Sequence, residues 1–304
     1  MKKILAVIAL VLIILITILP FVRDTEKMTL SPEIRATLSG SFVQLPQGVV
    51  HYQQAGPDTA QPVVLIHGFS VPYYIWDPTF AALAKDGFHV LRYDLFGRGY
   101  SDRPDAVYDR QFFEQQLLDL LNALEIKEPV DLVGVSMGGA ITTGFAVDYP
   151  HKVRNVVLID PFQEAFKIPG LDLPIIGEYL MTAFLAPSSP EMQMEDFYQP
   201  KRFPEWPSKY REQMKYYGFR RAILSTLRNF LNEDQLPIYQ RLGQLGKRVL
   251  LIWGEEDKTL PFSNSDRLRK ALNCNFFAVK QAGHIPQYER PEIVNPKLIH
   301  FLRE

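Results

Sequence analysis

The feature that most constrains this chain of 304 residues is a stretch in which an expected strand passes into an expected helix within one residue. Residues 129–135 form a β-branched apolar run bounded by a proline and a glycine, a pattern typical of a buried strand. Residues 137–149 carry apolar side chains at helical spacing and end before Pro150, which cannot continue a helix. Between the two lies the motif Gly134-x-Ser136-x-Gly138.

This abrupt change of direction predicts a strained, left-handed backbone conformation at Ser136. Gly134 and Gly138 lack the Cβ atoms that would collide in such a turn. We therefore expect the Ser136 hydroxyl at the end of a sheet, beside the backbone N–H of Met137. The motif by itself occurs often by chance, but its place between a strand and a helix makes it informative.

The composition is that of an ordinary globular protein, with 47% apolar and 22% charged residues. The formal net charge of −1 gives no indication of nucleic-acid binding. A single cysteine, Cys274, excludes an internal disulfide and leaves the redox compartment open.

Apolar runs alternate with helical patterns along most of the chain, which predicts an α/β fold with a mostly parallel, eight-stranded sheet and helices on both faces. In the first two strands apolar and polar residues alternate loosely, and these strands are expected to form an antiparallel hairpin at a sheet edge. Strands are expected at 37–46, 48–55, 62–68, 89–94, 129–135, 153–160, 248–253 and 275–280. Helices are expected at 79–85, 108–124, 137–149, 263–272 and 292–302.

One interval, residues 162–246, contains no convincing strand and is too long for a plain crossover. Its helical patches and frequent prolines predict a helical cap inserted above the carboxyl ends of the strands, where ligands of open α/β sheets bind. Residues 37–161 and 247–304 are then expected to form the core domain.

The N-terminus begins with Lys2 and Lys3 and continues with the apolar run Ile4–Leu19. A cleaved signal peptide and a retained membrane anchor are both consistent with this pattern. The length of the run and the lack of a small-x-small cleavage site favour an uncleaved transmembrane helix over residues 1–23, followed by a polar tether over 24–36. The two lysines favour a globular domain on the extracytoplasmic side, with secretion after cleavage as the lesser alternative.

A serine hydroxyl is a poor nucleophile unless a base takes its proton and an acid orients that base. Among six histidines, His284 follows the last expected strand in a glycine-preceded loop, at the same sheet edge as Ser136. Asp257 follows the strand at 248–253 and is the expected acid, while Glu255, Glu256 and Asp160 remain alternatives.

The order Gly-x-Ser-x-Gly, Gly-x-x-Asp-x-x-x-Pro and Gly-His resembles the α/β-hydrolase superfamily, in particular its capped serine esterase and lipase-like branch. The His67-Gly68 pair that closes a strand resembles the oxyanion loop of that family, and the loop at 94–102 is similar to that of many capped members. The resemblance covers about residues 45–303.

The resemblance implies that Ser136 is the nucleophile, His284 the general base and acid, and Asp257 the orienting carboxylate. It further implies that the backbone N–H groups of Phe69 and Met137 form the oxyanion hole.

A serine at the elbow argues against the haloalkane dehalogenase and epoxide hydrolase branches, which use an aspartate there. Aromatic side chains are frequent in the expected cap, and Tyr73, Trp76, Phe162 and Phe166 are expected to line an apolar substrate pocket. These features predict a carboxylic ester hydrolase for a lipophilic small-molecule ester or lipid.

Two other functions remain open. One is a carbon–carbon bond hydrolase of ring-cleavage products, which ranks lower because Ile285 follows His284 where that branch commonly has a tryptophan. The other is a non-catalytic ligand-binding homologue. Because no metal-ligand cluster or phosphate-binding loop is evident, we expect no cofactor. The sequence does not indicate the oligomeric state.

Overall fold

The computed structural model describes residues 2–304, apart from some side chains of the first helix. The transmembrane helix predicted over residues 1–23 falls partly outside the described part of the chain. The undescribed parts are Met1 and the side chains of Ala6, Ala9, Val11, Leu12, Ile13 and Leu15.

A single eight-stranded sheet forms the centre of the fold, in the strand order β1-β2-β4-β3-β5-β6-β7-β8. The hairpin of β1 and β2 is antiparallel and pairs antiparallel with β4, whereas all other neighbours are parallel, as predicted. The strands are β1 (Ser41–Leu45), β2 (Gly48–Ala55), β3 (Pro62–Ile66), β4 (His89–Tyr93), β5 (Val130–Val135), β6 (Val153–Ile159), β7 (Arg248–Gly254) and β8 (Asn275–Val279).

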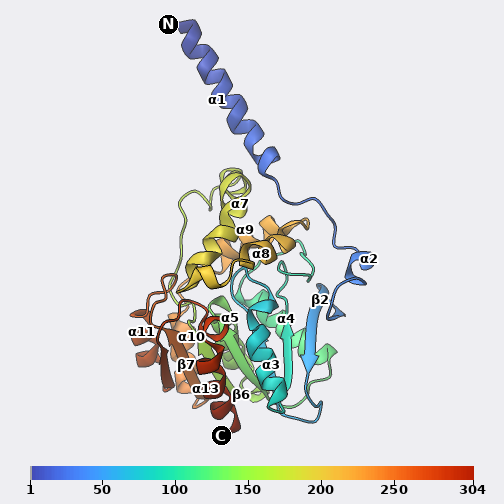
Figure 1. Cartoon of the computed structure of the whole chain (residues 1–304), viewed down its shortest axis with the longest axis vertical. Helices are drawn as coiled ribbons and strands as arrows, with labels where there is room; N and C mark the ends of the chain where they lie inside the picture. Colours follow the sequence, from blue (N-terminus) through green and yellow to red (C-terminus); the bar gives the residue numbers. More distant parts are fainter. Residues whose placement is uncertain (1) are drawn as a thin grey trace.

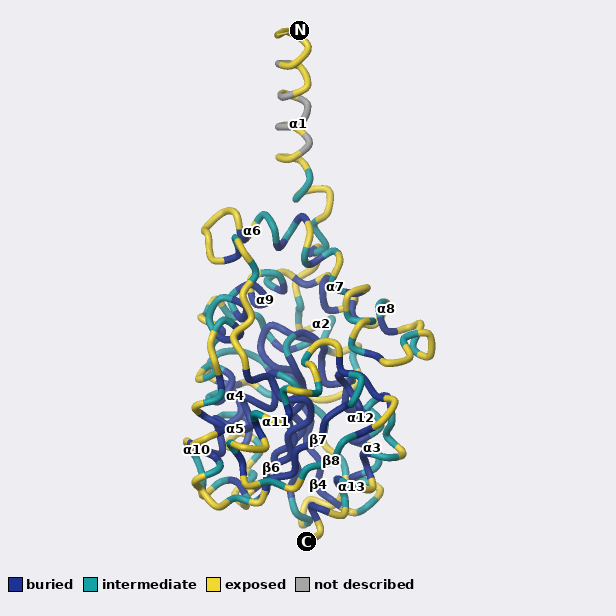
Figure 2. The backbone as a smooth tube through the Cα atoms, turned by 90° about the vertical axis from the view of Figure 1, so that its left-hand side faces the viewer, coloured by how far each residue is buried: buried dark blue, intermediate teal, exposed yellow. Residues whose placement is uncertain are grey.

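The central strands are buried on both faces because helices cover the sheet on either side. In Figure 2 one group of core helices lies on each side of the buried sheet. The first group comprises α3 (Asp77–Lys85), α12 (Pro286–Glu289) and α13 (Pro291–Arg303), and the second α4 (Arg110–Ala123), α5 (Met137–Asp148), α10 (Leu236–Gln244) and α11 (Asn264–Ala271).

A helical cap follows β6 and lies between the sheet and the N-terminal helix (Figure 1). It comprises α6 (Ile176–Leu180), a π-helical turn η3 (Met181–Leu185), α7 (Ala186–Met192), the short helices η4 (Gln193–Asp196) and η5 (Pro200–Arg202), α8 (Trp206–Met214) and α9 (Phe219–Asn229). The predicted cap extended to residue 246, but α10 packs on α5 and α11 and therefore lies with the core.

The N-terminal residues form helix α1 (Lys2–Arg23), which projects from the cap (Figures 1 and 2). Within the described residues, no helix combines the length and the apolar character that crossing a membrane requires. This finding contradicts the predicted transmembrane anchor and the extracytoplasmic localisation that depended on it. Pro20 lies near the end of α1, and the guanidinium of its final Arg23 donates to the Ala183 carbonyl of the cap at 2.9 Å, so this end of the helix contacts the folded domain.

Residues 24–28, which were expected to begin a polar tether, pack against the cap. The buried Glu26 carboxylate accepts the backbone N–H groups of Gly218 and Arg220 at 3.1 and 2.7 Å. The N–H of Met28 donates to the Lys215 carbonyl at 2.9 Å. This segment is therefore part of the folded domain.

Candidate active site

Ser136 occupies the sharp turn between β5 and α5, as the sequence predicts. Its backbone has φ 54° and ψ −124°, a conformation that is strained for any residue with a side chain. The Ser136 N–H donates to the Ile159 carbonyl at 2.9 Å, and its carbonyl accepts the Phe162 N–H at 3.0 Å. These bonds to the end of β6 and to the residues just after it hold the turn in place.

The two glycines of the motif are required by close backbone approach. A Cβ at Gly134 would lie 2.3 Å from the Gly138 carbonyl oxygen, and a Cβ at Gly138 would lie 2.3 Å from the carbonyl oxygen of Ile66 on β3. Any larger residue at either position would push the serine away from the end of the sheet.

His284 and Asp257 meet at the same edge of the sheet, although they are 27 residues apart in the chain. The imidazole Nδ1 of His284 lies 2.8 Å from Asp257 Oδ2, and both side chains are buried. The other carboxylate oxygen of Asp257 accepts the backbone N–H groups of Thr259 and Leu260, each at 2.8 Å. Asp257 is thus fixed as an acceptor, and His284 Nδ1 carries the proton between them.

Ser136 and His284 line one cavity of about 110 Å³. With Nδ1 directed at Asp257, the opposite ring nitrogen, Nε2, remains available to that cavity. Among the described residues no direct hydrogen bond joins the Ser136 hydroxyl to His284. In unliganded enzymes such bonds are often long and tighten only with substrate.

The electrostatic surroundings favour a protonated imidazole. Burial by itself lowers the pKa of His284, but the charge and hydrogen bond of Asp257, with a further contribution from Asp196, raise it to about 8. Burial, and then the Asp257 charge, raises the pKa of Asp160 well above its usual range. Asp160 is therefore favoured as a neutral acid.

Asp160, Asp257 and His284 offer ligand atoms that all lie within 4.8 Å of one another. A set of this kind could hold a metal ion in principle. Here the His284 nitrogen and Asp257 already bond to each other, and Asp160 Oδ1 accepts the Gly254 N–H at 2.9 Å. These hydrogen bonds already engage one ligand atom of each of the three residues.

The loop after β3 brings backbone donors to the serine. A Cβ at Gly68 would lie 3.1 Å from the Ser136 Cβ and 3.6 Å from its Oγ, and Phe69 lines the same cavity as Ser136. Within residues 2–304 neither the Phe69 N–H nor the Met137 N–H has a backbone acceptor. The buried Arg98 guanidinium donates to the Phe69 carbonyl at 2.7 Å and so fixes the loop.

His67, just after β3, is hydrogen-bonded to the backbone through both ring nitrogens. Its Nδ1 donates to the Gly68 carbonyl at 2.9 Å, and its Nε2 accepts the Leu95 N–H at 2.9 Å. Burial lowers the pKa of His67 to about 4, so the ring is neutral and serves to shape the loop.

The four predicted pocket residues do not line the serine cavity. Trp76 is fully buried in the core, Phe162 is buried next to the serine turn, and Phe166 is exposed. Tyr73 faces a different cavity. The prediction was wrong in detail because aromatic content shows that a segment packs but not which faces of its helices point inward.

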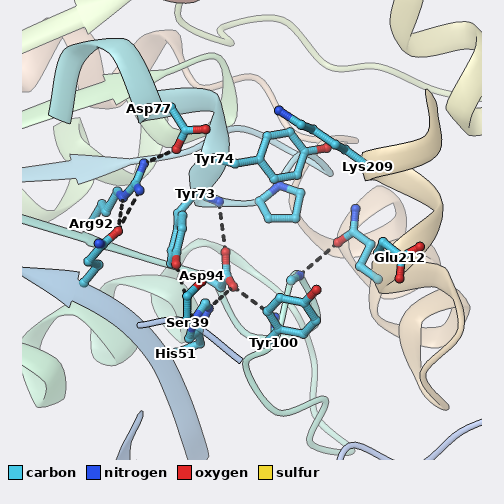
Figure 3. A pocket seen from close by; sticks show the side chains of 14 residues that line it. Ser39, His51, Tyr73, Tyr74, Asp77, Arg92, Asp94, Tyr100, Lys209 and Glu212 are labelled. Atoms are coloured by element: carbon cyan, nitrogen blue, oxygen red, sulfur yellow. Dashed lines mark hydrogen bonds and ion pairs between the residues drawn. The ribbon is translucent and has the colours of Figure 1, made fainter. Parts of the chain in front are cut away.

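A second cavity, of about 370 Å³, lies between the core and α8, and Tyr73 is among its lining residues (Figure 3). At its centre the Asp94 carboxylate accepts from His51 Nδ1 at 2.7 Å and from the Tyr73 and Tyr100 N–H groups at 2.9 Å. His51 Nε2 faces the Ser39 carbonyl at 2.8 Å. Both ring nitrogens thus face oxygen acceptors, so this pair stabilises loops and is not placed as a general base.

The lining of the serine cavity includes cap residues that sequence reasoning missed. Gln193 and Asp196 come from η4, and Thr259 comes from the Asp257 loop. The motif around Asp257 could have drawn attention to Thr259. Asp196 lies in a stretch without a motif, and only the packing of the cap brings it to the site.

A buried carboxylate, Glu289, joins the cap to the loop that carries the histidine. Its two oxygens accept the N–H groups of Tyr198 and Gln199 on the cap, at 3.0 and 2.7 Å, and that of Gly283 at 2.9 Å. Glu289 has no solvent exposure. Because one side chain binds both segments, the position of the cap and the position of His284 are coupled.

We predict that Glu289→Gln lowers the free energy of unfolding by about 2–4 kcal/mol, because the glutamine amide would turn a donor toward a backbone N–H. Thermal and denaturant unfolding measure this change. Glu292→Gln is the matched control, since Glu292 is exposed and forms a surface ion pair with Arg290, and it should change stability by less than about 1 kcal/mol. Equal effects of the two substitutions would contradict the coupling.

Comparison with known proteins agrees with this geometry. The sequence profile of the α/β-hydrolase fold matches residues 61–291, which is most of the chain. The chain belongs to the α/β-hydrolase fold family, and it is a hydrolase of that fold.

Several known proteins are similar over most of their length. Lipase 1 of Psychrobacter immobilis is 27% identical over 279 residues, covering 88% of this chain and 85% of the lipase. The 2-hydroxy-6-oxo-2,4-heptadienoate hydrolase of Pseudomonas putida is 28% identical over 243 residues, covering 75% of this chain and 84% of that hydrolase. The crystal structure of the enol-lactonase from Burkholderia xenovorans LB400 superposes with a TM-score of 0.75 at 21% identity, over 87% of this chain and 100% of that one. The last likeness concerns the fold alone.

Proposed function

We propose that this protein is a serine hydrolase that cleaves carboxylic esters through an acyl-enzyme on Ser136. The observation that carries the proposal is the hydrogen bond between His284 Nδ1 and Asp257 at the cavity that Ser136 also lines. In this arrangement the serine has a base, and the base has an orienting acid.

In the first step the Ser136 Oγ attacks the ester carbonyl carbon while His284 Nε2 takes the hydroxyl proton. The negative charge that develops on the carbonyl oxygen is stabilised by the N–H groups of Phe69 and Met137. Asp257 stabilises the imidazolium. When the tetrahedral intermediate collapses, the C–O bond to the alcohol breaks and His284 returns the proton to the alcohol.

In the second step water attacks the acyl carbon and gives a proton to His284. The bond to Ser136 Oγ then breaks, the proton returns to the serine, and the carboxylic acid leaves. The histidine acts as base and as acid in each half of the cycle.

The cavity supports an ester with an apolar acyl part. Val71, Ile75 and Ile285 line it together with the backbone of the oxyanion loop. We predict that kcat/KM rises from acetate to longer unbranched p-nitrophenyl esters, because each buried methylene adds apolar contact. A series that peaks on acetate or on charged esters would contradict this substrate class.

A carbon–carbon bond hydrolase is the alternative, because a relative bears the name of a heptadienoate hydrolase. A dienoate carries a carboxylate, whereas this cavity contains the Asp196 carboxylate and, among the described residues, no lysine or arginine. The lining thus favours the ester. A side-by-side assay of p-nitrophenyl hexanoate and a ring-cleavage dienoate decides between ester hydrolysis and carbon–carbon bond hydrolysis. We expect efficient turnover of the ester and little turnover of the dienoate.

The pKa of His284 predicts the pH dependence of the reaction. Because the base must be unprotonated and its pKa is about 8, kcat/KM for a neutral ester should rise about tenfold per pH unit in the acid range and level off above about pH 8. A profile measured with a stable ester tests this. A plateau already complete at about pH 6 would contradict the assigned base.

A further inference from the structure

We propose that Asp196, a carboxylate of the cap, makes the serine cavity select esters that carry no negative charge. This inference rests on the proposed function, because it assigns a substrate class to the same site. Asp196 ends the short helix η4 and lines the cavity with Ser136 and His284.

Asp196 is held in the cavity wall through both its backbone and its side chain. Its carbonyl accepts the His284 N–H at 2.7 Å, and its Oδ1 accepts the Thr259 hydroxyl at 2.6 Å. A Cβ at Gly283 would lie 2.3 Å from the Asp196 carbonyl oxygen, so a glycine before the histidine is what permits this approach. The carboxylate therefore has a fixed place beside the base.

The charges around this cavity are unbalanced. Of its lining residues only Asp196 and His284 are ionisable, and the imidazole is already paired with Asp257. No lysine or arginine within residues 2–304 lines the cavity. A substrate carboxylate would thus meet the like charge of the half-buried Asp196, with no lysine or arginine among the lining residues to pair with it.

The protonation of Asp196 makes this selection dependent on pH. Burial raises the pKa of its carboxyl, with Asp257 acting in the same direction and the His284 charge opposing them. The preference for neutral over anionic esters should therefore weaken in acid, as Asp196 takes up a proton, and be greatest in alkaline solution. Asp160, the remaining acid of the cluster, is favoured as neutral and adds little charge.

The test compares two pairs of esters that differ in one carboxylate, at about pH 8.5, which is above the pKa of the base. The acyl pair is p-nitrophenyl hexanoate and mono-p-nitrophenyl adipate, and the alcohol pair is para-carbamoylphenyl acetate and para-carboxyphenyl acetate. For wild type we expect kcat/KM of the neutral ester to exceed that of the anionic ester by about tenfold or more in at least one pair.

Asp196→Asn should raise kcat/KM for the disfavoured anionic ester by about tenfold, because the like charge is gone. Asparagine keeps the backbone bond to His284 and an oxygen for the Thr259 hydroxyl. The variant should also shift the pH profile on neutral esters to lower pH, since Asp196 contributes to the raised pKa of His284. Damage to the fold would not increase any rate.

Glu195→Gln is the matched control, because it removes the same charge from the same helix at an exposed position. It should leave the ratio of neutral to anionic activity within about twofold.

Wild type that hydrolyses both members of both pairs equally well would overturn the inference, even if the Asp196 variant did not fold. So would an Asp196→Asn enzyme that retains neutral activity without any gain on the anionic esters. A wild-type enzyme that hydrolyses neither of the two neutral esters would instead overturn the proposed function, and this inference with it.

Discussion

Replacing Ser136 with alanine is expected to lower kcat for a neutral ester by about 10⁴- to 10⁶-fold, since the nucleophile of the acyl-enzyme route is lost. The remaining rate would come from the oxyanion donors and from substrate binding. Alanine removes only the hydroxyl and keeps a small side chain at the strained turn, so the thermal midpoint should change little. Steady-state kinetics with highly purified protein measure the loss.

Ser263→Ala is the control for this substitution. Ser263 is exposed at the start of α11, and its side chain makes no capping hydrogen bond. Its variant should retain wild-type kinetics within about twofold. A Ser136→Ala enzyme that keeps more than about a tenth of the wild-type kcat would rule out Ser136 as the nucleophile.

Asp257→Asn is expected to lower kcat by about 10⁴-fold, because it forces the wrong tautomer on the histidine. The N–H groups of Thr259 and Leu260 require an oxygen at the position of Oδ1. The asparagine amide nitrogen must then face His284 Nδ1, which becomes an acceptor and moves the proton to Nε2. In that form the ring cannot take a proton from Ser136.

Asp160 and Glu255 provide the matched comparisons for this prediction. Because its raised pKa favours a neutral Asp160, Asp160→Asn replaces one uncharged group with another and should reduce kcat by less than about tenfold. Glu255→Gln should have no effect beyond about twofold. A large loss in Asp160→Asn together with activity in Asp257→Asn would assign the orienting acid to Asp160.

Much of the fold could be predicted from the sequence because its strands are apolar on both faces. Such runs indicate a parallel sheet covered by helices, and β3, β5 and β7 each lie where that pattern places them. The turn at Ser136 was predictable for a local reason, since only a glycine on either side permits it.

The edge of the sheet at which the candidate residues meet was also predictable. Parallel strands end at one edge, so residues just after β5 and β7 must lie near each other. That His284 lies there follows from its place after β8.

The contribution of the cap could not be predicted, because it depends on contacts between distant segments. Asp196 and Glu289 belong to no motif, and their roles follow from hydrogen bonds to the His284 loop. Tyr73 begins a short helix, η1 (Tyr73–Trp76), that follows the loop after β3, and it lines the neighbouring cavity instead of the serine cavity. The anchor predicted from the length and flanks of the apolar run at the N-terminus was likewise wrong, since no described helix is long and apolar enough to cross a membrane.

The most direct test of the central claim is to identify the residue that a fluorophosphonate modifies, by peptide mapping of the labelled protein. We expect one phosphonylated residue, Ser136, and strongly slowed labelling in a folded His284→Ala variant. An adduct on another residue, or labelling that persists in Ser136→Ala, would show that Ser136 is not the nucleophile.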